Sequence, residues 1–232
     1  MAALESAVVV YLRALYYPDG FTVALKLIDQ KILLIEIVRE AATLCMIWAV
    51  GYLAGKNIYT RFAFSLICFA VWDIFYYVWL KVFIDWPASL FDWDILFLIP
   101  ITWLGPVLSP VICSFTMILL AMVIFDLSPT FKVPKTVKAL LLSGVALILY
   151  TYLYDYGHLI VSHDLLYDYP QLLKNESFVN LASNYLPTHY QWNIFWIGEA
   201  LIGAAIFQLY KMSTIKNPRS VVPENAMKGK SA

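Results

Sequence analysis

Ionisable side chains recur inside the most apolar stretches of this 232-residue chain, where a charge is difficult to bury. These side chains are Glu36, Arg39, Glu40, Asp73, Lys81 and Glu199. Lys81 lies near the end of its stretch, from which a lysine can reach the membrane surface. A charge at the bilayer centre costs roughly 2.5–3.5 kcal/mol and normally faces a partner or a cavity. The other five residues therefore mark a candidate site inside the membrane.

The spacing of these residues predicts that they face inward from neighbouring helices. Residues three and four positions apart lie on one face of a helix. One polar stripe of this kind consists of Glu36, Arg39, Glu40 and Thr43. Tyr77 falls on the same side of the next apolar stretch as Asp73, and Glu199 has two glycines nearby, Gly198 and Gly203, which allow helices to approach closely. We therefore expect the polar faces to meet, with the arginine bridging carboxylates.

The charges of this cluster do not balance. Four carboxylates face one arginine, which leaves about three negative charges, and Lys81 offsets one at most. The remaining carboxylates should be protonated or should hold a cation. The sequence therefore predicts a membrane subunit or small transporter-like module that binds or conducts a proton, a cation or a small polar solute. One alternative is a non-catalytic scaffold whose buried charges pair with another subunit of a membrane complex or with a second copy.

The three histidines lie just beyond the apolar stretches and close to acidic residues; they are His158, His163 and His189. Imidazole with carboxylate suits a transition metal, and two histidines from facing helix ends can ligate haem. The separation of His158 and His163 does not align them on one helix, and no histidine lies inside a membrane stretch. The histidines can therefore be hydrogen-bonded residues without a cofactor. One alternative is a redox subunit that holds a metal, haem or quinone near its outer face, and another is a protonation switch.

The composition of the chain predicts that these residues lie on membrane helices. Apolar residues make up 62% and charged residues 14%, with a mean hydropathy of +0.73. A soluble domain carries about 25% charged residues. The 16 basic residues are balanced by 16 acidic residues, so the protein has no net positive charge to attract nucleic acid. No Walker, GxGxxG, GxSxG or HExxH motif occurs, so the sequence requires no cofactor and leaves open whether the protein is catalytic.

The predicted fold is an all-α, polytopic transmembrane helix bundle. About 20 apolar residues cross a bilayer core as a helix. Five stretches reach that length, at about 32–54, 62–84, 95–125, 137–156 and 191–211. Prolines and a glycine interrupt the first half of 95–125, so we expect a short half-helix or re-entrant piece at 95–104, followed by a span.

The segments outside the spans predict the orientation of the bundle. Residues 1–31 are expected on the outer side with an interfacial helix at 7–17, and residues 212–232 as a flexible basic tail. Ten basic residues fall on the side of that tail and four on the opposite side. Basic residues accumulate on the cytoplasmic side of membrane proteins. The N-terminus is therefore predicted outside and the C-terminus in the cytoplasm.

A block between Arg61 and Val111 contains FAVWDIFYYVWL, WPASLFDWD and ILFLIPITWLGPVLSPV, and the segment REAAT at 39–43 precedes it. This block resembles a stretch of uncharacterised bacterial multipass inner-membrane proteins. The resemblance covers roughly the first half of the chain. It implies a bacterial inner-membrane location, and it assigns neither an activity nor a catalytic residue.

Overall fold

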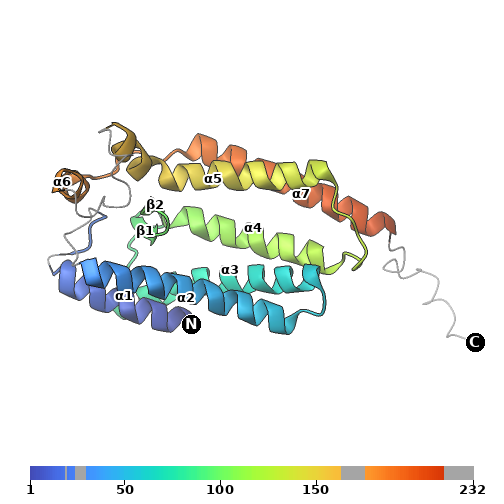
Figure 1. Cartoon of the computed structure of the whole chain (residues 1–232), viewed down its shortest axis with the longest axis horizontal. Coiled ribbons are helices and arrows are strands. Elements are labelled where there is room, and N and C mark those ends of the chain that lie inside the picture. The colour runs from blue at the N-terminus through green and yellow to red at the C-terminus, as the bar shows by residue number, and fades with distance from the viewer. Residues whose placement is uncertain (19, 24–29, 163–175, 217–232) are drawn as a thin grey trace, which may run out of the picture.

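The chain forms a bundle of long helices with one small β-hairpin between them (Figure 1). The computed structural model describes residues 1–18, 20–23, 30–162 and 176–216. The described elements are α1 (Ala2–Tyr16), α2 (Gln30–Ala54), α3 (Ile58–Ile84), β1 (Trp93–Phe97), β2 (Trp103–Pro106), α4 (Leu108–Phe125), α5 (Lys135–Ser162), α6 (Glu176–Asn184) and α7 (Trp192–Lys216). The predicted all-α class is confirmed.

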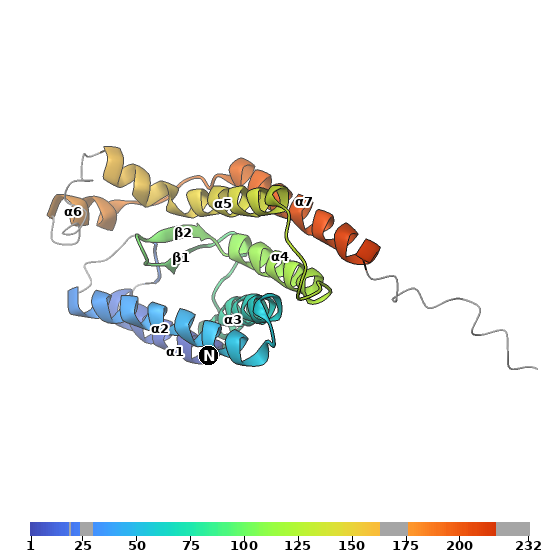
Figure 2. The same ribbon diagram turned by 45° about the vertical axis from the view of Figure 1, so that its right-hand side comes forward.

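The long helices lie in three layers. Helices α1, α2 and α3 form one outer layer, α5 and α7 form the other, and α4 lies between them (Figure 1). The hairpin continues the middle layer beyond the start of α4, as the turned view shows (Figure 2). The closest helix pairs are α5 with α7, α3 with α4, and α2 with α3. The middle layer therefore touches both halves of the bundle.

Four described helices, α3, α4, α5 and α7, are long and apolar enough to cross a membrane, so the chain is a membrane protein. They correspond to four of the five predicted spans. Helix α2 has 25 residues but carries the charges of the polar stripe. Its passage through the membrane therefore stays a prediction.

The half-helix, one of two expectations for 95–104, is wrong, because this piece lies within a β-hairpin. Its entry into the membrane as a re-entrant piece stays a prediction. Strands β1 and β2 pair antiparallel, with Trp93 opposite Pro106 and Ile95 opposite Leu104. The strands are rich in aromatic and branched residues, which favour extended structure. Proline also removes a helix donor, whereas two paired strands can satisfy each other's backbone groups away from water. The predicted span after this piece is confirmed as α4.

Two glycines set the close approach of α5 and α7. A Cβ atom at Gly144 would lie 2.7 Å from the carbonyl oxygen of Gly198, and a Cβ at Gly198 would lie 2.9 Å from that of Gly144. The two backbones are therefore in contact. The approach predicted at Gly198 is confirmed. At Gly203 it is wrong, since a Cβ there would meet no described residue within 4 Å.

Helix α1 packs along α3 and lies beside α2 (Figure 1). The Ser6 hydroxyl donates to the carbonyl oxygen of Tyr76, in α3, at 2.9 Å. The interfacial position of 7–17 stays a prediction. The contact between Ser6 and Tyr76 shows in addition that α1 packs as part of the bundle. Most of the predicted tail, residues 217–232, lies outside the described residues.

Candidate functional site

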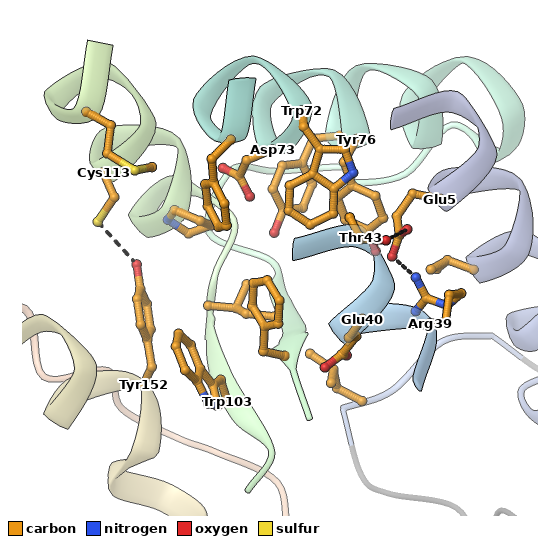
Figure 3. Close-up of a pocket in the computed structure, with 18 residues that line it drawn as sticks. Glu5, Arg39, Glu40, Thr43, Trp72, Asp73, Tyr76, Trp103, Cys113 and Tyr152 are labelled. Carbon is orange, nitrogen blue, oxygen red and sulfur yellow. Dashed lines mark hydrogen bonds and ion pairs between the residues drawn. The ribbon is translucent and has the colours of Figure 1, made fainter. Parts of the chain in front are cut away.

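A cavity of about 130 Å³ lies between α2, α3, α4, α5 and the hairpin (Figure 3). Its walls combine aromatic rings with a few polar side chains. The polar ones are Glu5, Arg39, Glu40, Thr43, Asp73 and Cys113. Three members of the predicted polar stripe therefore share a cavity with Asp73 and Tyr77. The fourth, Glu36, is buried beside this cavity.

Arg39 bridges two carboxylates, as the stripe predicted. Its Nη2 lies 2.7 Å from Glu36 Oε2, one turn earlier on α2. Its Nη1 forms an ion pair with Glu5, in α1, a residue that the sequence predicts in the outer segment 1–31 and not in this cluster. Thr43 Oγ1 donates to the same carboxylate at 3.4 Å. The arginine charge is therefore shared between two acids, and Arg39 forms an ion pair with neither Glu40 nor Asp73.

Glu40 joins α2 to the hairpin segment. Its two carboxylate oxygens accept from the backbone N–H of Leu98 at 3.0 and 3.2 Å. The side chain is buried. No ion pair connects Glu40 to any residue that the structure describes.

Asp73 lies near the middle of α3 and faces α4. Its Oδ2 accepts from the hydroxyl of Ser114 at 2.8 Å. The carboxylate lies on the same side of α3 as the cavity (Figure 3). Within the described ranges, Asp73 forms no ion pair either. Asp73 and Glu40 are therefore two acids of one cavity without a cationic partner.

Glu199 lies outside this cavity, so the structure divides the predicted cluster. Its carboxylate accepts from Thr116 Oγ1 at 2.7 Å and from the Cys113 thiol at 3.4 Å, both on α4. It lines a separate groove between α4 and α7 that also includes Gly203. The Cys113 sulfur lies 3.5 Å from the hydroxyl of Tyr152 and lines the main cavity. Cys113 therefore connects the two acidic sites.

A second buried ion pair was not predicted. Arg13 Nη2, in α1, lies 3.1 Å from Asp94 Oδ1, in the hairpin. The guanidinium carbon lies 3.8 Å from the ring centroids of both Phe21 and Trp86. Burial raises the pKa of the Asp94 carboxyl to about 6, and the nearby guanidinium opposes this shift. The spacing of Glu5 and Arg13, which places both on one helix face, is the signal that could have identified α1 as part of the site.

The second ion pair enlarges the predicted excess of negative charge. Within the described residues, two arginines, Arg13 and Arg39, lie among seven carboxylates of the bundle interior. These seven are Glu5, Glu36, Glu40, Asp73, Asp94, Asp155 and Glu199. Lys81 pairs with Asp85 at the exposed end of α3 and offsets none of them. Protonation, a bound cation or a positive charge from another subunit could compensate the remaining acids.

The histidines do not form a described metal centre. His158 is exposed on α5, where it stacks on Tyr154 with centroids 5.8 Å apart, and His189 is exposed before α7. His163 lies outside the described residues. Among the described residues, no group of three histidine, cysteine or acidic side chains is placed to hold a metal ion.

Comparison of the chain with protein-family models, with curated proteins and with solved structures finds no match. The resemblance of the block from Arg61 to Val111 therefore stays a prediction.

Proposed function

We propose that this membrane protein binds a proton or a small cation in the cavity between α3 and the hairpin and conducts it along α4. The observation that carries the proposal is that Glu40 and Asp73 line one cavity, without an ion-pair partner in the described part of the chain.

The energetics of burial support binding. Removing an ionised carboxylate from water costs several kcal/mol, and attraction to a counter-charge must offset this. Asp73 has one hydroxyl donor, Ser114, and Glu40 has one backbone donor, at Leu98. These neutral donors replace only part of the hydration that an ionised carboxylate loses, and they leave its charge uncompensated. Uptake of a proton or cation supplies that compensation.

The polar residues of α4 support conduction. Ser114 bonds Asp73 on one side of the helix, and Cys113 bonds Glu199 toward α7. Buried acids connected in this way are typical of proton and ion pathways in membrane proteins. The groove beside Glu199 provides a second opening, between α4 and α7. A path from the cavity through Cys113 to this groove therefore involves only α4 and the elements that contact it.

The proposal also includes the orientation of the protein, the membrane in which it lies and its partners. The ten-to-four distribution of basic residues supports an N-terminus outside and a C-terminus in the cytoplasm. A bacterial inner membrane is the location that the resemblance implies. Self-association or other membrane subunits are compatible with the apolar outer faces of the bundle, which lipid also covers.

The first prediction tests the carboxylate that faces the cavity. We expect Asp73→Asn to reduce proton flux in vesicles to the level of protein-free vesicles, because the amide keeps the shape and the Ser114 contact but cannot exchange a proton. Flux is measured with a pH-sensitive dye enclosed in the vesicles and driven by a potassium diffusion potential. The same vesicles with sodium or potassium gradients test metal-cation flux.

A matched control is Asp126→Asn, at the exposed end of α4. It changes the same charge outside the cavity and should leave the flux unchanged. Equal flux from Asp73→Asn and the unaltered protein would contradict the proposal. Release of a co-purifying subunit by Asp73→Asn, without any flux from the unaltered protein, would favour the scaffold alternative.

A further inference from the structure

The wall of the cavity is a continuous series of aromatic rings. Trp72 lies 6.2 Å from Phe97, Phe97 lies 5.3 Å from Trp103, and Trp103 lies 6.0 Å from Tyr152, measured between ring centroids. These rings come from α3, from both strands of the hairpin and from α5. Tertiary packing therefore assembles one aromatic surface in the cavity that the acids also line.

An aromatic surface beside an unpaired carboxylate attracts a particular kind of ligand. The face of an aromatic ring is negative and attracts cations, most strongly where water is excluded. Asp73 uses one carboxylate oxygen for Ser114, and no hydrogen bond of its other oxygen to a described residue is observed. The cavity thus offers this Asp73 oxygen and several aromatic rings to its occupant.

The composition of the walls distinguishes between classes of cation. A hard metal cation such as calcium takes about six to eight oxygen ligands. Among the described residues, no group of three acidic, histidine or cysteine side chains is suited to a metal ion. A primary ammonium carries three N–H donors and needs as many acceptors. An alkylated ammonium needs few or no acceptors and presents methyl groups to the rings.

The volume of the cavity limits the size of the ligand. The cavity holds about 130 Å³. An engineered cavity of about 150 Å³ in another protein accepts benzene, which has about six heavy atoms. A ligand of roughly the same number of heavy atoms therefore fits here, which is the size of tetramethylammonium.

From this juxtaposition we infer that the cavity binds a small alkylated ammonium cation, with Asp73 as its counter-ion and the rings of Trp72, Phe97 and Trp103 around its methyl groups. The inference rests on the proposed cation-binding function and names the class of cation.

The test is titration calorimetry of the full-length protein in detergent, with tetramethylammonium chloride as the ligand and potassium chloride as the charge control. We expect saturable binding of tetramethylammonium alone. Asp73→Asn should weaken it about 100-fold, since about 1.4 kcal/mol corresponds to tenfold and the counter-charge is lost inside the membrane.

Two substitutions at Trp72 isolate the aromatic contribution. Trp72→Leu and Trp72→Phe both shorten the side chain and both remove the indole N–H, which has no hydrogen-bond partner among the described residues. Only phenylalanine keeps a ring face. We expect about tenfold weaker binding for the leucine variant and near-normal binding for the phenylalanine variant.

The outcomes separate the inference from the function on which it rests. Equal affinity of the two Trp72 variants would overturn the inference, and so would potassium binding as tightly as tetramethylammonium, even if Asp73 were required. Asp73-dependent proton flux without tetramethylammonium binding would overturn the inference and leave the proposed function standing. If Asp73→Asn does not fold, the Trp72 pair still decides the question.

Discussion

Replacement of Arg13 by methionine is expected to lower the free energy of unfolding by about 3–5 kcal/mol, because it leaves a buried carboxylate without its partner. The side chains of Arg13 and Asp94 are only 9% and 2% exposed. The guanidinium also lies between the rings of Phe21 and Trp86. The substitution removes the ion pair and both ring contacts at once.

Thermal unfolding in detergent, followed by circular dichroism, measures this effect. The double variant Arg13→Met with Asp94→Asn removes both charges and should recover most of the lost stability. The pKa of Asp94 is raised to about 6 by burial although Arg13 opposes this shift, so loss of Arg13 should raise the pKa further. Acidification from about pH 7 to about pH 5 then protonates the unpaired carboxyl and should shrink the deficit of the single variant. A single variant as stable as the unaltered protein at about pH 7 would show that the pair does not stabilise the bundle.

The second large effect is expected at the contact of α5 with α7. Gly144→Leu should lower the free energy of unfolding by about 3 kcal/mol, the upper end of the range for overpacking. Already the Cβ atom would lie 2.6 Å from Ile202 Cγ1 and 2.7 Å from the backbone oxygen of Gly198. A backbone oxygen cannot rotate away as a side chain can. The two helices must therefore separate, which moves Glu199 away from α4.

Gly203→Leu is the matched control for this substitution. It places the same side chain in α7, at a position where a Cβ atom meets nothing within 4 Å in the described part of the chain. We expect its unfolding temperature to stay close to that of the unaltered protein. Equal losses of stability in the two variants would show that the contact between α5 and α7 does not determine the effect, because glycine to leucine raises the helix propensity at both positions.

Local spacing predicted the parts of the candidate site that lie on one helix. Glu36 and Arg39 are three residues apart on α2, so their ion pair follows from helix geometry alone. The membrane spans could also be predicted, because the length of an apolar stretch is read directly from the sequence. Four of them, α3, α4, α5 and α7, are helices of the expected kind.

The hairpin shows where local spacing fails. The prolines and the glycine near residue 100 correctly predicted a break before α4. They did not reveal whether the broken piece would form a half-helix or strands. That choice depends on where the backbone groups of this piece find partners, and β1 finds them on β2.

The sequence by itself determined that this is a membrane bundle with more acids than bases in its interior, because composition and helical period need no knowledge of neighbours. Only the tertiary structure decided which acids share a cavity. It paired Arg39 with Glu5 and Glu40 with the backbone of Leu98, and it placed Glu199 on the far side of Cys113. Helical spacing determines the face on which a side chain lies, whereas the helix that it meets depends on how the layers pack.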